Sequence, residues 1–125
     1  MPEEKTLAEA VDALADRFRS MPQSRLHGAV PGHPSRAAAA LALARWMAAV
    51  AQAAEGGPVR ELPEAGAFAV GDQLAVTGHD LVAALAALPR DGEVALPAES
   101  GGPTPVAAVR AEAASRLAET AVLCG

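Results

Sequence analysis

The sequence predicts an all-α domain, a compact bundle of four helices joined by long loops. Two observations lead to this fold class. The chain has 125 residues, the length of one domain (1–125), and hydrophobic residues make up 51% of it. Four stretches space their apolar side chains three or four residues apart, as helices do. Aromatic residues make up only 2% and alanine is the commonest residue, so the bundle has few large side chains for its core.

The first predicted helix begins after Thr6, with Glu9 three residues later, which is the pattern of a capping box. Pro22 ends it. Large apolar residues alternate at spacings of four and three along one face: Leu7, Val11, Leu14, Phe18 and Met21.

The second predicted helix runs from Pro34 to about Glu55 and is ended by the breaker 56–58. Its segment 37–54 is nearly free of polar groups and long enough to resemble a membrane span. Alanine gains little in lipid, however, and Arg45 lies near the middle, where a charge costs about 2.5–3.5 kcal/mol. We therefore expect no membrane insertion and place this helix in the core of the bundle.

The third predicted helix runs from Asp72, as N-cap, to Leu88. Gly78 interrupts it at a cost of about 1 kcal/mol relative to alanine. Either a close helix crossing or coding bias explains that glycine. One stripe carries the remaining apolar residues: Leu74, Leu81, Leu85 and Leu88.

The fourth predicted helix has Thr104 as N-cap and Pro105 at its first position, and reaches about Leu123. The connections between the helices are long, about 12, 16 and 15 residues, and permit crossovers as well as neighbouring packing. Two short apolar runs, 67–70 and 93–96, predict the alternative fold, a small α+β domain with a minimal two-stranded sheet.

The net charge is −5, but it is unevenly distributed. No acidic residue lies between Asp16 and Glu55, an interval with five arginines (+5), so the rest of the chain, with five basic and 15 acidic residues, carries −10. A bipolar surface of this kind suits an acidic partner, an anionic ligand or another copy. The single cysteine, Cys124, cannot form a disulfide within the chain and is assigned to a frayed C-terminal tail. The N-terminal segment Met1–Lys5 is acidic and does not have the pattern of a secretory signal. We therefore expect a cytoplasmic protein.

A Gly- and Pro-rich loop within this basic interval leads into the second helix. Backbone N–H groups and the positive end of the dipole at a helix start favour an anion, and arginine adds bidentate donors. The loop contains no phosphate-binding or dinucleotide fingerprint. It predicts a site for an anionic small ligand, with these candidate residues: Arg25, His27, His33, Ser35 and Arg36.

The second helix also carries a candidate protein interface around the only tryptophan. Tryptophan and arginine are enriched at interaction hot spots, although a lone tryptophan is more often a core anchor. The candidate residues are Arg45, Trp46, Met47 and Val50. A thin core also gains from burying alanine faces against a second copy. The leading hypothesis is therefore a cytoplasmic interaction or adaptor module that self-associates; the anion-binding domain is the alternative.

An enzyme ranks third. Gln73, Thr77 and Asp80 share one helix face, with His79 beside them, and this face is interpreted as the solvated side of the helix. No serine or cysteine nucleophile pairs with a histidine by spacing, and no catalytic residue is assigned. We expect no metal and no cofactor, because His27 and His33 lack a third ligand at zinc-site spacing. Nucleic acid is disfavoured by the −10 charge elsewhere and by the absence of a stacking platform.

Overall fold

The computed structural model describes residues 6–58, 60–96 and 102–125 and shows the predicted helical fold. The N-terminal segment 1–5, on which the expectation about a secretory signal was based, lies outside the described residues. The elements, in chain order, are α1 (Leu7–Arg19), α2 (Gln23–Leu26), α3 (Arg36–Glu55), η1 (Ala67–Ala69), α4 (Val70–Ala86), β1 (Glu93–Val94), β2 (Thr104–Pro105) and α5 (Val106–Leu123).

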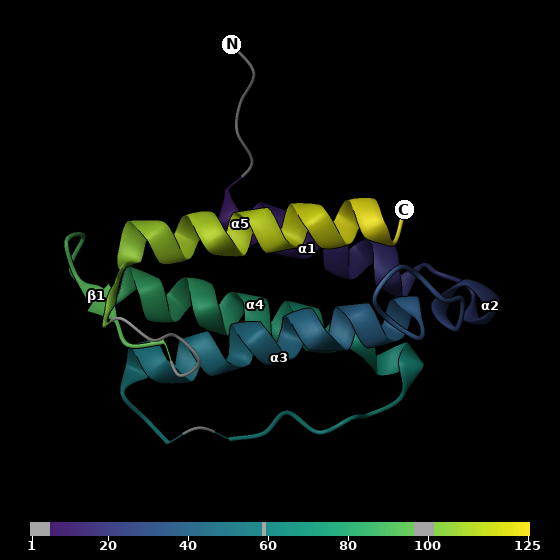
Figure 1. Ribbon diagram of the computed structural model, residues 1–125, viewed down its shortest axis with the longest axis horizontal. Coiled ribbons are helices and arrows are strands. Elements are labelled where there is room, and N and C mark those ends of the chain that lie inside the picture. The colour runs from purple at the N-terminus through teal and green to yellow at the C-terminus, as the bar shows by residue number, and fades with distance from the viewer. Residues whose placement is uncertain (1–5, 59, 97–101) are drawn as a thin grey trace, which may run out of the picture.

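The four long helices lie side by side, with one crossover between them (Figure 1). α1 and α5 run in one direction and α3 and α4 run in the other. Because α3 and α4 are consecutive and parallel, the connection between them returns along the whole length of α3, where Figure 1 shows it as the long teal segment. This crossover accounts for one of the long loops.

The helix ends follow the local chemistry of the sequence. The capping box of α1 is present: the Thr6 hydroxyl accepts from the Glu9 N–H at 3.1 Å, and the Glu9 carboxylate accepts from the Thr6 N–H at 3.4 Å. Ser35 caps α3 by accepting from the Ala38 N–H at 3.0 Å. At the other end of α3, Gly56 adopts a left-handed conformation (φ 72°), which a glycine tolerates without strain.

Three predicted boundaries differ from the structure by one to three residues. α3 begins at Arg36, because Ser35 and not Pro34 precedes the first turn. α4 begins at Val70 as a continuation of η1, so Asp72 lies in its first turn and not at the N-cap. Thr104 pairs in a strand, which leaves Pro105 as the N-cap of α5. The short α2 was not predicted, because four residues carry no periodicity.

The minimal sheet of the alternative fold exists, but with a different partner. β1 pairs antiparallel with β2, with Glu93 opposite Pro105 and Val94 opposite Thr104. The predicted partner 67–70 forms η1 and the start of α4 instead. The correction has a physical reason: Val94 is buried under the start of α5, whereas the run around Phe68 continues directly into a helix.

The core is built mainly from α3 and α4, as predicted for the alanine-rich helix. α3 packs most extensively against α4. The length and composition of α3 would allow a membrane crossing, with a window of mean hydropathy 1.4, but half of that window is buried inside the fold. Its buried residues are Ala37, Ala39, Ala40, Leu41, Leu43, Ala44, Met47, Val50 and Ala51.

Two glycines bring α4 close to α1. A Cβ added at Gly78 would lie 2.4 and 2.7 Å from the two Val11 methyl groups. A Cβ at Gly71, two turns earlier on the same face, would lie 2.8 Å from the Arg19 Cγ and 3.0 Å from the Ala15 carbonyl oxygen. The structure therefore explains Gly78 by a close helix crossing.

We expect Gly78→Ala to destabilise the domain by about 1–2 kcal/mol. Overpacking costs about 1–3 kcal/mol, and a Cβ at 2.4 Å from a methyl group of the stiff Val11 side chain falls in the upper part of that range, about 2–3 kcal/mol; the better helix propensity of alanine returns about 1 kcal/mol. Urea denaturation measures the change. Gly57→Ala is the matched control, because a Cβ there has nothing within 4 Å, and its effect should stay within about 0.5 kcal/mol. An unchanged midpoint for Gly78→Ala would contradict the close crossing.

Candidate functional site

Three of the five arginines of the acid-free interval hold the C-terminal end of α5. Arg17 donates from Nη1 to the Ala121 carbonyl at 3.1 Å. Arg36 donates from Nε to the Cys124 carbonyl at 3.2 Å, and Arg25 donates from Nη2 to the Gly125 backbone oxygen at 2.8 Å. Cations are favourable at this end of a helix, where carbonyl groups lack partners within the helix. The basic interval thus has a structural partner within the same chain.

The five predicted anion-binding residues do not converge on one site. The guanidinium groups of Arg25 and Arg36 bind the chain's own oxygens, and the Ser35 hydroxyl caps α3. His27 lines a cavity between α3 and α4, while His33 lines a different hollow between α3 and α5. The loop is therefore a docking point for α5, and only His27 and Ser35 remain together at a cavity.

Cys124 is fully buried beneath this arginine cluster, so the prediction of a frayed tail is wrong. Burial raises the pKa of the Cys124 thiol above its ordinary value, and the charges of Arg36 and Arg17 partly oppose that shift. A protonated, buried thiol is a poor nucleophile.

The four predicted interface residues occupy three different environments: Met47 and Val50 are buried, Trp46 is half-buried and Arg45 is exposed. Met47 and Val50 are 0% and 2% exposed, so they belong to the core and offer nothing to a partner. Trp46 is half-buried, with the Arg116 guanidinium of α5 lying 4.4 Å from its ring centre. This cation–π contact joins α3 to α5, in keeping with the core-anchor alternative.

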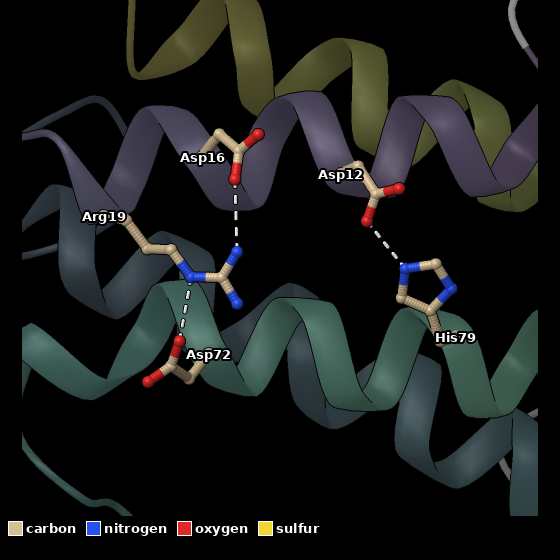
Figure 2. A network of polar contacts seen from close by, with 5 residues as sticks. All are labelled: Asp12, Asp16, Arg19, Asp72 and His79. Atoms are coloured by element: carbon tan, nitrogen blue, oxygen red, sulfur yellow. Dashed lines mark hydrogen bonds and ion pairs between the residues drawn. The ribbon is translucent and has the colours of Figure 1, made fainter.

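His79 of α4 contacts an aspartate of α1. Its Nε2 lies 2.6 Å from Asp12 Oδ1, and both side chains are about half exposed to solvent. Figure 2 shows this pair bridging α1 and α4, next to Arg19, whose guanidinium lies between Asp16 and Asp72. Hydrogen bonds to Asp72 and Asp16 raise the pKa of the Arg19 guanidinium. The described residues give His79 no hydrogen bond to a hydroxyl or thiol.

Thr77 corrects the expectation of a solvated face on α4. It is 4% exposed, and its hydroxyl donates to the Gln73 carbonyl at 2.8 Å. Among the three residues of that face, only Asp80 is exposed.

Three side chains hold the crossover segment 60–66 against the bundle. The Gln52 carboxamide oxygen accepts from the Arg60 N–H at 2.6 Å. Arg45 donates from Nε to the Leu62 carbonyl at 3.1 Å, and Gln73 donates from Nε2 to the Pro63 carbonyl at 2.9 Å. The segment therefore has a fixed path, and it encloses a cavity against α3 and α4.

This cavity has a volume of about 430 Å³ and combines an apolar floor with five polar side chains. The floor is formed by alanines of α3 together with Leu41 and Val70. The polar side chains are His27, Ser35, Arg45, Glu64 and Gln73. Among them, only His27 and Ser35 were assigned to a ligand site from the sequence, because the crossover that brings the others beside them has no sequence signature.

A second surface feature lies beside it. Three large hydrophobic residues are exposed in the described part of the chain, and two of them, Phe68 (68%) and Val76 (61%), lie on η1 and α4. An apolar hollow of about 200 Å³ is lined by Leu62, Ala69, Val76 and others, and Ala69 directly follows Phe68 in the chain. In the sequence, the signal for this exposed surface was Phe68, an isolated aromatic residue in a Gly- and Ala-rich connection. The alternative fold assigned it to a strand instead.

Comparisons with protein-family models, with curated proteins and with solved structures find no match to this chain. Among the residues that the structure describes, no group of three His, Cys, Asp or Glu side chains is placed to hold a metal ion. The proposals below therefore depend on geometry alone.

The arginine cluster, defined as Arg17, Arg25 and Arg36, should control how fast Cys124 reacts with an alkylating reagent. We expect Arg36→Ala to increase the alkylation rate of Cys124 about tenfold or more, because a hydrogen bond to a charged group contributes about 1.5–3 kcal/mol to holding the α5 end. Removing the Arg36 charge alone would raise the thiol pKa further and slow the reaction, so a faster rate reports exposure. Arg90→Ala, at an exposed arginine outside the cluster, is the matched control. If Cys124 is alkylated at the same rate in Arg36→Ala as in Arg90→Ala, Arg36 does not hold the end of α5.

Proposed function

We propose that this protein is a small protein-interaction module that self-associates through the Phe68 patch, defined as Leu62, Phe68, Ala69 and Val76. The observation that carries the proposal is the exposure of Phe68, at 68%, in a chain with only three Phe and Trp residues. Exposed aromatic side chains next to other apolar groups mark interaction surfaces.

The patch combines a projecting side chain with an adjoining hollow. A two-fold axis places the same surface of two molecules against each other. Phe68 of one copy would then enter the apolar hollow of the other, and the reverse contact would form at the same time. A projection and a hollow on one surface therefore favour a second copy as the occupant.

The charges beside the patch are compatible with this contact. Asp72, at the edge of the hollow, is paired with Arg19 at 2.8 Å within the same molecule. The pairing neutralises a carboxylate that would otherwise face its own copy across the axis. In this pairing, the Arg19 guanidinium binds carboxylates of its own chain.

The remaining partner assignments follow from the same contacts. All five arginines of the acid-free interval donate hydrogen bonds within the chain, which fixes the position of their guanidinium groups, and the charge of −10 on the rest of the chain argues against nucleic acid as a partner. The single buried thiol suits a reducing compartment, and we propose the cytoplasm.

We expect the wild-type protein to form a dimer in sedimentation velocity at micromolar concentrations and Phe68→Ser to weaken dimerisation at least tenfold, because aromatic anchors contribute about 2 kcal/mol or more. Val122→Ser is the matched control, since Val122 is 84% exposed on α5, away from the patch, and its loss should leave the dimer intact. A wild-type protein that stays monomeric at its highest soluble concentration would contradict the proposal. A Phe68→Ser variant that dimerises like the control would place the interface elsewhere.

A further inference from the structure

The cavity between α3, α4 and the crossover segment 60–66 has the properties of a small-molecule site. Its volume of about 430 Å³ falls within the range of roughly 300–1,000 Å³ for such sites. Its apolar floor comprises Ala38, Leu41 and Val70 among others, and its polar groups are confined to a few positions, as is usual where polar contacts fix the orientation of a ligand.

Two opposite charges line this cavity without binding each other. Arg45 and Glu64 both contribute to its wall, yet no ion pair joins them among the described residues. Arg45 uses only its Nε, in the hydrogen bond to Leu62, and its two Nη groups make no hydrogen bond within the described part of the chain. The cavity thus offers a fixed cation for a carboxylate and, separately, an anion for an amine.

Gln73 adds an acceptor that the described residues leave unsatisfied. Its Nε2 donates to the Pro63 carbonyl, which fixes the orientation of the carboxamide, and its Oε1 is buried without a hydrogen-bond partner. A buried acceptor without a donor costs about 1–3 kcal/mol. A ligand N–H would supply that donor once the Gln73 carboxamide turns its oxygen toward the cavity, a rotation that gives up the hydrogen bond to the Pro63 carbonyl.

We propose that this cavity binds a zwitterionic amino acid with an apolar side chain. The ligand carboxylate would contact Arg45, with His27 as a second donor. Its ammonium group would contact Glu64 and the Gln73 oxygen, and its side chain would lie on the apolar floor. This activity goes beyond the proposed self-association and does not depend on it.

The experiment titrates L-leucine into the full-length protein and follows backbone amide shifts by NMR. We expect saturable shifts at Ala38, Leu41 and Val70 at millimolar or lower concentration. N-acetyl-L-leucine lacks the ammonium and L-leucinamide lacks the carboxylate, so each should bind about tenfold more weakly or worse, because a hydrogen bond to a charged group contributes about 1.5–3 kcal/mol.

Variants connect the binding to the site. Arg45→Gln should weaken leucine binding about tenfold or more, whereas Arg90→Gln, at an exposed arginine outside the cavity, should leave it unchanged. Phe68→Ser should also bind leucine normally, which separates this proposal from self-association. The absence of saturable shifts at the floor residues would overturn the proposal. Equal binding of leucine and both derivatives would also overturn the proposal, as would an Arg45→Gln variant that binds leucine as tightly as Arg90→Gln does. If circular dichroism shows that Arg45→Gln is unfolded, the comparison of leucine with its two derivatives tests the proposal instead.

Discussion

Close approach between helix backbones is the constraint on which the rest of this structure depends. The sequence supplies few large side chains, so dispersion contacts have to come from small residues that allow neighbouring helices to touch. Ala40 and Ala44 of α3 are completely buried. At Gly71 and Gly78 of α4, atoms of α1 occupy the space that a Cβ would need. A domain of this kind tolerates little added volume between its helices. Its packing also places the consecutive helices α3 and α4 parallel to each other, and this arrangement requires the long connection between them.

A thin core also explains why so much charge is used inside the chain. Hydrogen bonds from Arg17, Arg25 and Arg36 fix the last turn of α5 and cover Cys124, where a larger protein would use apolar packing. Trp46 and Arg116 connect the middle of α5 to α3 by a cation–π contact. The uneven charge distribution is therefore largely an internal property of the fold, and a basic interval in a sequence is not by itself a ligand site.

The elements with strong periodicity or specific end signals were predictable from the sequence. The capping box at Thr6, the buried alanine-rich helix and the breaker at Gly56 all report local chemistry, which a single sequence contains. The pairing of β1 with β2, the internal partners of the arginines and the cavity depend on contacts between distant segments. Met47 and Val50 show the same limit: helical spacing identifies an apolar side, but only the packing of α4 decides that this side is core.

The parallel arrangement of α3 and α4 generates both surfaces on which function is proposed. Two consecutive parallel helices need a crossover, and this crossover has to lie along the bundle because the chain must return to the end where α3 began. Arg45 and Gln73 bind the segment's carbonyl groups, and this anchoring encloses the cavity on one side of Gln73. The same segment contributes Leu62 to the hollow beside Phe68 on the other side. The connection that the packing of the core requires thus lies beside the two features on which the binding proposals depend, the exposed Phe68 side chain and the Gln73 oxygen that has no hydrogen-bond partner among the described residues.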